Sequence, residues 1–364
     1  MFISEIQLNN YRNYEIAKVE LSEGINVLLG ENAQGKTNLL EAVYLCSIGK
    51  SMRTPRDREL IRYECNRAKI SAVTKSAVGT NRVDIVLEKH DNKRVSINGA
   101  QASKLGELMG IIRTVLFSPD EMAIIKDGPS ERRRFMDIAL CQLSRAYFYL
   151  LQRYNKILSQ RNRLLKNKVG SETLDVWDLQ LAYEGAKIIK TRKGFVSRMN
   201  ELTQNVHNFL TDNKENLTLN YESIAGKNEN EIRENFLAEL NRTRVRDCQN
   251  GFTHIGAHTD DFSVMANEID LRKYGSQGQQ RTAALTLKLA LLDLFKTETN
   301  ESSILLLDDV FSELDKNRQK RLIEKLKGHQ TIITCTHLDD TIFSSREGMR
   351  IFYVKDGVVT LEQK

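Results

Sequence analysis

A glycine-rich segment, residues 30–37, has the residue types and spacing of a phosphate-binding loop. It follows the apolar run 25–29 and precedes a stretch whose apolar residues fall at helical spacing. Its glycines let backbone N–H groups surround phosphate oxygens, and the start of the following helix favours negative charge. Lys36 is expected to reach the β- and γ-phosphates of a nucleotide, and the Thr37 hydroxyl to bind Mg²⁺. The residues predicted to hold the nucleotide here are Gly30, Glu31, Asn32, Ala33, Gln34, Gly35, Lys36, Thr37 and Asn38.

Two adjacent carboxylates lie far downstream, at the end of another apolar run. Residues 304–307 are Ile-Leu-Leu-Leu, and Asp308 and Asp309 follow them. A buried parallel strand would place Asp308 beside the phosphate loop as a direct or indirect partner of Mg²⁺ and would leave Asp309 to orient the attacking water. Apolar runs that end in Asp are common, so this assignment depends on the phosphate loop. The predicted metal ligands are Thr37 and Asp308, and the predicted catalytic residues here are Lys36, Asp308 and Asp309.

A third polar segment, residues 274–280, opens a predicted helix that begins near Gln279. Its sequence is Tyr-Gly-Ser-Gln-Gly-Gln-Gln. Serine, glycine and free N–H groups at a helix start make a second anion site, where Ser276, Gly278 and Gln279 would contact the nucleotide. The same residues also fit a simple helix N-cap followed by a flexible glycine. The position of the segment, about 30 residues before Asp308, favours the anion site.

Strand-like runs occur at both ends of the chain, and helical periodicity fills the middle. Predicted strands cover residues 2–8, 25–29, 82–88, 94–97, 111–117, 217–221, 262–265, 303–307, 331–335 and 349–354, with a hairpin turn at Asn98-Gly99. Apolar residues over 135–158 and 177–209 fall three and four apart, which predicts two helices in an antiparallel hairpin with a break near Gly170. The first helix, of about 35 residues, would extend roughly 50 Å. Another helix is predicted over residues 279–296.

These elements predict an α/β fold of two lobes. The expected first lobe, residues 1–115 and 295–364, has a mixed sheet with helices, built from both chain ends around the phosphate loop. The expected second lobe, residues 116–294, is an inserted and mainly helical segment. It bears a short antiparallel helical arm at about 131–211 and the polar segment 275–280.

The composition is that of an ordinary folded protein. Of 364 residues, 40% are apolar and 28% charged, which argues against disorder. No apolar run approaches the length of a membrane span, and the N-terminus does not resemble a secretory signal. Five cysteines without a Cys-x-x-Cys pair predict buried, unpaired thiols in a reducing, cytoplasmic compartment.

The basic residues are unevenly distributed. The net charge is +6, yet residues 131–168 alone hold ten basic and two acidic residues. A local excess of this kind indicates a polyanion partner, although a solvated helix face is the alternative. The candidate polyanion contacts are Arg53, Arg56, Arg58 and Arg62 after the first helix, and Arg132, Arg133, Arg134, Arg153, Lys156, Arg161 and Arg163 on the arm. Ion pairs that pack the lobe are the alternative role for Arg132, Arg133 and Arg134.

The order of these pieces resembles the head domain of ABC-type ATPases. The phosphate loop corresponds to Walker A, residues 274–280 to the signature motif, and Asp308-Asp309 to Walker B. Residues 312–315 correspond to the D-loop, and His337 to the switch histidine. Within this class the chain is most similar to the bacterial recombination family RecF, over residues 10–14, 30–37, 117–121, 128–137, 275–281 and 308–315.

The resemblance implies an ATP-dependent DNA-binding protein of recombinational repair and replication. RecF-like proteins dimerise with ATP, bind single-stranded or gapped duplex DNA without sequence preference, and work with RecR and RecO to help load RecA and induce the SOS response. ATP and Mg²⁺ are the implied cofactors, and weak ATP hydrolysis acts as a release switch. No membrane partner is implied.

The resemblance also assigns roles to three further residues. Asp315 would contact nucleotide, Arg12 would touch a nucleotide phosphate, and His337 would contact the γ-phosphate, with a purely structural histidine as the alternative. Asp309 stands where related ATPases carry Glu, which is consistent with slow turnover. Ser118-Pro119 stands where they carry a Mg²⁺-sensing Gln.

Two other functions fit parts of the pattern. An energy-coupling ATPase subunit of a membrane complex would need a membrane partner and would show no DNA-dependent change in ATP turnover. A chromosome-organising head would need long arms, which this chain lacks.

Overall fold

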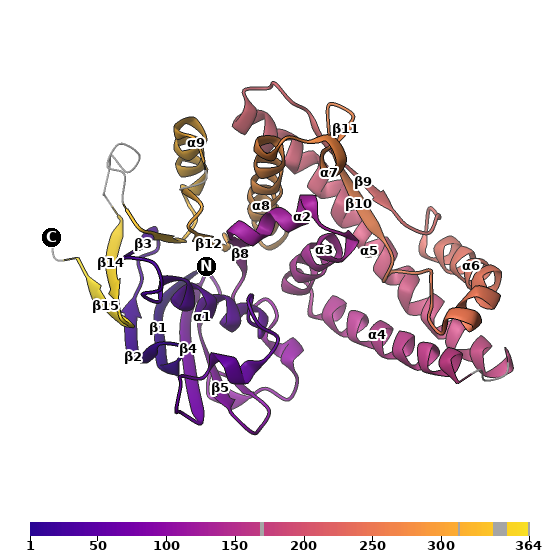
Figure 1. Cartoon of the computed structure of the whole chain (residues 1–364), viewed down its shortest axis with the longest axis horizontal. Coiled ribbons are helices and arrows are strands. Elements are labelled where there is room, and N and C mark those ends of the chain that lie inside the picture. The colour runs from indigo at the N-terminus through magenta and orange to yellow at the C-terminus, as the bar shows by residue number, and fades with distance from the viewer. Residues whose placement is uncertain (168–170, 312–313, 338–347, 363–364) are drawn as a thin grey trace. The chain divides into compact units, whose positions relative to one another are not determined.

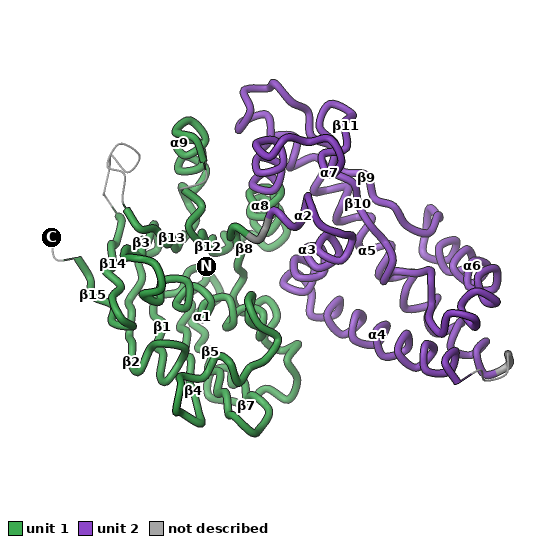
Figure 2. Tube along the Cα trace, in the orientation of Figure 1, with its two compact units in different colours: residues 1–121, 287–364 green, residues 122–286 purple. Residues whose placement is uncertain are grey.

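The computed structural model describes residues 1–167, 171–311, 314–337 and 348–362. The chain divides into two compact units, one formed by residues 1–121 and 287–364 and the other by residues 122–286 (Figure 2). The divisions predicted from the sequence fall after residues 115 and 294. The α/β fold class is confirmed by two six-stranded sheets in the first unit and a mainly helical second unit.

One sheet of the first unit carries the phosphate loop. Its strand order is β15 (Val358–Leu361), β14 (Arg350–Lys355), β3 (Ile25–Leu29), β13 (Thr331–Cys335), β12 (Ile304–Asp308) and β8 (Thr114–Phe117). All neighbouring strands are parallel except β14 and β15. Every residue of β12 and β13 is buried, as expected for inner strands covered on both faces. At the carboxyl edge, Leu29 lies opposite Cys335, and Asp308 opposite Thr334.

The second sheet of this unit is antiparallel. Its strand order is β2 (Tyr14–Glu20), β1 (Phe2–Tyr11), β4 (Arg67–Ser76), β5 (Gly79–Glu88), β6 (Arg94–Ile97) and β7 (Ala100–Gln101). Asn98 and Gly99, with φ of 53° and 83°, form the predicted turn between β6 and β7.

Helix α1 (Lys36–Ile48) packs between the two sheets of the first unit. It contacts β4 and β5 of the antiparallel sheet and β8, β12 and β13 of the parallel sheet (Figure 1). Residues 39–47 of this helix are therefore buried without interruption. The phosphate loop at its start is thus held by a helix that has little freedom to move.

Short elements complete the first unit. They are the 3₁₀ turns η1 (Asp57–Leu60) and η2 (Leu105–Leu108) and the helix α9 (Lys316–Leu326), while the 3₁₀ turn η3 (Pro119–Met122) ends at the first residue of the second unit. Helix α8 (Gln277–Thr299) begins in the second unit and ends in the first.

The second unit is built around a helical hairpin. Its helices are α2 (Ala123–Lys126), α3 (Pro129–Leu143), α4 (Arg145–Lys166), α5 (Ser171–Thr211), α6 (Glu229–Asn250) and α7 (Leu271–Tyr274). A small sheet has the order β11 (Ile269–Asp270), β10 (Asp261–Ala266) and β9 (Leu217–Glu222). Helix α5 packs on α4, α6 and β9. Ion pairs Arg153–Glu184 and Arg161–Asp178 run in opposite sequence directions, which confirms the predicted antiparallel arm.

The prediction of one continuous first arm helix is wrong, because the structure has two helices there. Helix α3 ends at Leu143 and α4 begins at Arg145. Ser144 between them has extended backbone angles, and its hydroxyl accepts a hydrogen bond from the Tyr147 N–H at 3.2 Å. A serine N-cap of this kind starts a new helix although the apolar periodicity continues across it.

The sequence predicts that the chain has no membrane-spanning run and that its cysteines are buried and unpaired. Within the described part of the chain, no helix is long and apolar enough to cross a bilayer. All five cysteines are free thiols. Cys46, Cys141 and Cys335 are buried as predicted, whereas Cys65 and Cys248 are partly exposed.

Candidate functional site

The phosphate loop connects β3 to α1 in the way the sequence predicts. Gly35 has a φ of +114°, and a Cβ there would lie 2.6 Å and 2.8 Å from the side-chain amide atoms of Asn13. Only glycine fits this turn without displacing Asn13. No side chain caps the N-terminus of α1, so its first N–H groups are available to an anion.

The Lys36 ammonium lies inside the loop. Its Nζ donates to the carbonyl oxygens of Gly30 at 2.6 Å and Glu31 at 2.7 Å. Burial lowers the pKa of Lys36, and the carboxylates of Asp309 and Asp308 act in the opposite direction. The loop therefore folds around a positive charge that faces two carboxylates, where a nucleotide phosphate with its metal ion would be neutralised.

Thr37 and Asp308 meet as predicted. The Thr37 hydroxyl donates to Asp308 Oδ1 at 2.8 Å, which joins the start of α1 to the end of β12. A hydroxyl and a carboxylate are hard oxygen ligands of the kind that Mg²⁺ takes, with phosphates and water completing its shell. The residues present therefore fit a Mg²⁺–nucleotide complex.

Thr334 is a site residue that the sequence analysis missed. Its hydroxyl donates to Asp308 Oδ1 at 2.7 Å, and the Asp309 N–H donates to the Thr334 hydroxyl at 3.0 Å. Asp309 itself has a φ of +52°, in the left-handed region. Thr334 therefore orients both carboxylate residues from the neighbouring strand, and only the strand order could have identified it.

A second missed group braces the loop from outside. Tyr14 donates its hydroxyl to the Gly35 carbonyl at 2.8 Å, and Asn13 Nδ2 donates to the Gln34 carbonyl at 2.9 Å. The turn between β14 and β15 adds two more bonds, because the N–H of Asp356 donates to Gln34 Oε1 at 2.7 Å and that of Gly357 to the Gln34 carbonyl at 3.2 Å. Asn13 and Tyr14 lie in a segment that resembles RecF, which is the signal that could have marked them.

Arg12 does not present a free guanidinium. Its Nε and Nη2 donate to the two oxygens of Glu41, both at 2.9 Å, and Nη1 donates to the Glu59 carbonyl at 3.0 Å. Glu41, fully buried on α1, also accepts from the Tyr11 and Ser51 hydroxyls. A phosphate contact by Arg12, as predicted, would have to share the guanidinium with these partners.

We expect Glu41→Gln to destabilise the protein at neutral pH but not in acid. Burial raises the pKa of Glu41, but the bonds from Arg12 and Ser51 outweigh it and hold this pKa below its usual value. Such a carboxylate stabilises the fold above its unfolded pKa of about 4.3, and the contribution is lost as the pH falls through the lower folded value. The variant should lose about 1.5–3 kcal/mol at pH 7.

Thermal unfolding of both proteins from pH 7 to pH 3 measures this effect. The gap between their midpoints should narrow as the pH falls below about 4.3. A gap that stays constant over the whole range would mean that the Glu41 charge adds nothing to stability.

Two other predicted nucleotide contacts, His337 and Asp315, lie in a loop and at a helix start. His337 is exposed, two residues after the end of β13. The Asp315 carboxylate caps α9, accepting from the N–H groups of Asn317 and Arg318. Ser312 and Glu313, also predicted for the D-loop, lie outside the described residues.

The segment around Ser276 forms a capping box. Gln279 N–H donates to the Ser276 hydroxyl at 3.2 Å, and Ser276 N–H donates to Gln279 Oε1 at 3.0 Å. These bonds match the helix-cap alternative, and α8 begins at Gln277, two residues before the predicted start. Ser276 remains exposed and Gly278 half-buried, so this helix start faces solvent in the single chain.

The basic residues near α1 are partly engaged. Arg53 and Arg56 are exposed, and Arg62 is half-buried. Arg53 donates to Asn38 Oδ1 at 3.0 Å, Arg56 pairs with Glu59 at 3.4 Å, and Arg62 pairs with Glu15 at 3.1 Å. Exposed pairs of this kind are weak and open easily to phosphate.

Arg132 is a correction to the predicted DNA surface. Its side chain is 3% exposed, its Nε and Nη2 donate to the Asp261 carboxylate, and its Nη1 donates to the carbonyl oxygens of Ile124 and Asp127. All these bonds pack the second unit, as the alternative interpretation requires. Arg133 donates to the Asp260 carbonyl at 2.7 Å, while Arg134 is exposed beside Glu131.

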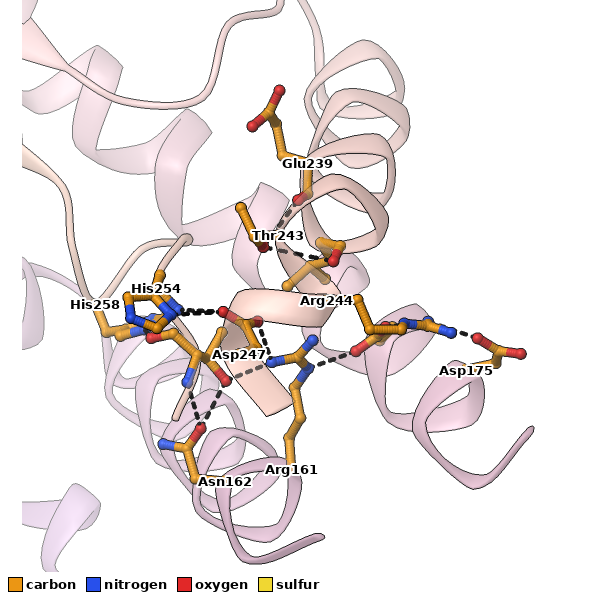
Figure 3. A network of polar contacts seen from close by, with 12 residues as sticks. Arg161, Asn162, Asp175, Glu239, Thr243, Arg244, Asp247, His254 and His258 are labelled. Atoms are coloured by element: carbon orange, nitrogen blue, oxygen red, sulfur yellow. Dashed lines mark hydrogen bonds and ion pairs between the residues drawn. The ribbon is translucent and has the colours of Figure 1, made fainter. Parts of the chain in front are cut away.

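Arg161 is a second correction, because it lies inside the arm. It is fully buried, and its guanidinium bonds to Asp178 of α5, Asp247 of α6 and Thr253 (Figure 3). Arg244 and His254 hold the remaining oxygens of the two carboxylates. The surface of the arm keeps Arg153, Lys156 and Arg163, all exposed.

Comparisons with known proteins identify the family of this chain. Residues 2–360 match the family described as RecF/RecN/SMC N terminal domain. "DNA replication and repair protein RecF" of Lachnoclostridium phytofermentans is 46% identical over 363 residues, covering 99% of both chains. Its counterpart in Lachnospira eligens is 43% identical over 368 residues, covering all of both chains.

Solved structures give the same result. A structure described as the recombination mediator protein RecF-ATP in the RecFOR pathway is 36% identical, with a TM-score of 0.92, over all of this chain and 98% of that one. An SMC head bound to the C-winged helix domain of ScpA, 15% identical with a TM-score of 0.59, shares the fold. The fold, the phosphate loop with its facing carboxylate, and full-length relatives together show that this chain belongs to the RecF family of DNA replication and repair proteins.

Proposed function

We propose that this chain is an ATP-gated DNA-binding switch of recombinational repair and replication. The observation that carries the proposal is the contact of Thr37 with Asp308, 2.8 Å long, beside the Lys36 ammonium in a glycine loop. Solved relatives are described with ATP and with ATPrS, and they cover the whole chain. ATP is therefore the proposed nucleotide.

The loop residues divide the work of holding the nucleotide. Backbone N–H groups of residues 30–38 and the start of α1 would bind phosphate oxygens. Lys36 would exchange its present carbonyl partners for phosphate. Thr37 and Asp308 would hold Mg²⁺, which supplies positive charge between the phosphates when bound.

Hydrolysis is proposed to be slow. Asp309 would orient the attacking water and His337 would contact the γ-phosphate, one from the end of β12 and the other after β13. An aspartate reaches one methylene less far than glutamate, so it positions the water less well. Slow hydrolysis suits a switch whose bound state must last.

ATP is proposed to join two copies head to tail. Ser276, Gly278 and Gln279 of one copy, together with Asp315, would contact the nucleotide held by Lys36 of the other. The exposed start of α8 supports this, because Ser276 and Gln277 face solvent in the single chain. A twofold axis then closes two equivalent sites, and hydrolysis removes the shared phosphate charge.

DNA and pathway proteins are the proposed partners. The exposed arginines Arg53, Arg56 and Arg134 and the half-buried Arg62 would contact phosphates of single-stranded or gapped duplex DNA without reading sequence. RecR, RecO and RecA are the proposed pathway proteins, since the solved relatives are described within the RecFOR pathway. The proposed location is the cytoplasm. None of the comparisons favours an energy-coupling subunit of a membrane complex.

We expect Ser276→Arg to prevent ATP-dependent dimerisation while ATP still binds. An arginine at this exposed helix start would add bulk and an extended side chain where the second copy must dock. Mass photometry with ATP and Mg²⁺ should find dimers of the wild type and monomers of Ser276→Arg. Arg272→Ala, on the neighbouring exposed surface of α7, is the matched control and should dimerise normally.

A fluorescent ATP analogue should bind wild type and Ser276→Arg with affinities within about threefold, since the loop belongs to the other unit. Dimers of Ser276→Arg at the wild-type ATP concentration would contradict the head-to-tail arrangement.

A further inference from the structure

The most exposed aromatic ring of the described residues is Tyr63, at 88% relative exposure. We propose that Tyr63 is a base-stacking residue, on which an unpaired base of bound DNA lies. This inference rests on the proposed function, and it names an unpaired base as the part of the DNA that this surface recognises. Every base has a π-face, so stacking on tyrosine is compatible with sequence-independent binding.

The turn that carries Tyr63 is held firmly. On one side Leu60 and Ile61 are buried, and the Arg62 N–H donates to the Asn10 carbonyl of β1 at 2.8 Å. On the other side the Cys65 N–H donates to the Arg62 carbonyl at 3.0 Å. Because the backbone is fixed on both sides of the ring, little chain entropy is lost when a base stacks on it.

Glu64 shows that the turn is costly to form. It has a φ of +66°, in the left-handed region, which a glutamate rarely adopts. Strain of this kind persists only where the surrounding structure imposes it, and it is concentrated at functional positions. Here it turns the chain so that a large apolar ring points into solvent, where it contributes nothing to the core.

The charges around the ring suit nucleic acid. Residues 53–69 contain six basic and three acidic residues. Two of the acids are already paired within the unit, Asp57 with Lys93 at 3.0 Å and Glu59 with Arg56 at 3.4 Å. Arg53, Arg58 and Arg67 are exposed, so cations flank Tyr63 on both sides in the sequence.

The lack of other large exposed apolar side chains in this segment argues against a protein partner at Tyr63. Within residues 53–69, Leu60, Ile61 and Ala68 are buried. A protein hot spot usually sits among further apolar contacts that exclude water, whereas Tyr63 is the only large exposed apolar side chain of this segment.

Tyr63→Ala and Tyr63→Phe test the assignment. The probe is a gapped duplex with 2-aminopurine at the first unpaired position, titrated with full-length protein in ATP and Mg²⁺. Tyr63→Ala should bind about 10- to 100-fold more weakly and lose the fluorescence quenching caused by stacking. Tyr63→Phe, which keeps the ring, should retain both. Val78→Ala, at an apolar side chain that is 94% exposed, is the matched control.

The salt dependence separates stacking from charge. Tyr63→Ala should leave the slope of log Kd against log salt unchanged, whereas Arg58→Gln should reduce it by about one. Equal Kd and quenching for Tyr63→Ala and wild type would overturn this inference alone. No binding of the gapped duplex by the wild type would overturn the proposed function as well.

Discussion

Replacing Lys36 by Met is expected to raise the Kd for ATP by about 100- to 1000-fold. The ammonium donates to two loop carbonyls at 2.6 Å and 2.7 Å, which hold it inside the loop, where it can donate to phosphate oxygens. A charge-assisted bond is worth about 1.5–3 kcal/mol, and two such bonds account for the expected loss. Methionine has nearly the same length without the charge. Isothermal titration with ATP and Mg²⁺ measures the effect.

Lys50→Met is the matched control. Lys50 is exposed just beyond the C-terminal end of α1, so its loss should leave the Kd unchanged. The free energy of unfolding of Lys36→Met, measured by thermal unfolding, should lie within about 1 kcal/mol of the wild-type value, because the change removes a partly buried charge without leaving a cavity. Unchanged ATP affinity in Lys36→Met would show that the phosphate loop does not hold the nucleotide.

Replacing Arg161 by Met is expected to cost about 3–5 kcal/mol of stability in the second unit. Arg161 is fully buried and joins three helices, with Asp178 and Asp247 exposed by only 3% and 0%. Without the guanidinium these two carboxylates remain buried and repel each other, although Arg244 and His254 still hold one oxygen of each. Calorimetry should find a melting transition about 6–20 °C lower.

Arg153→Met on the same helix is the control for this change. Its ion pair with Glu184 is 3.1 Å long, but the Arg153 side chain is 55% exposed. An exposed pair of this kind is worth about 0–1 kcal/mol, so the variant should melt close to wild type. If both variants melted alike, the buried network of Figure 3 would have no special part in holding the arm together.

The sequence alone predicted the parts of the site whose signal is local. Residues 30–37 carry their chemistry in one run, and Asp308 could be paired with them because inner parallel strands end at a common edge. The bond from Thr37 to Asp308 bears out that pairing.

Other parts depend on the three-dimensional arrangement. Thr334 acts only because β13 lies between β3 and β12, so that Thr334 is opposite Asp308. Arg132 and Arg161 looked like surface charge in a basic helix. Each bonds to a carboxylate far away in the sequence, Arg132 to Asp261 and Arg161 to Asp247, at separations of 129 and 86 residues. A helical pattern does not show which face will meet such distant partners.

Secondary structure was missed for related reasons. Helix α6 has few apolar residues and buries only Ile232, Phe236, Leu240 and Asp247, so its periodicity is weak. Strand β2 pairs with β1, but its adjacent residues Glu15 and Ile16 are both exposed, so its apolar residues do not alternate regularly. The division at Ser144 depends on one hydrogen bond, which apolar spacing cannot reveal.

The most direct test of ATP gating is fluorescence anisotropy of a labelled gapped duplex, with and without ATP and Mg²⁺, for the wild type and Lys36→Met. If ATP gates DNA binding, the wild type should bind tightly and in a salt-sensitive way with ATP, and binding should be weak without ATP or by Lys36→Met under either condition. Tight binding that ignores both the nucleotide and Lys36 would contradict it.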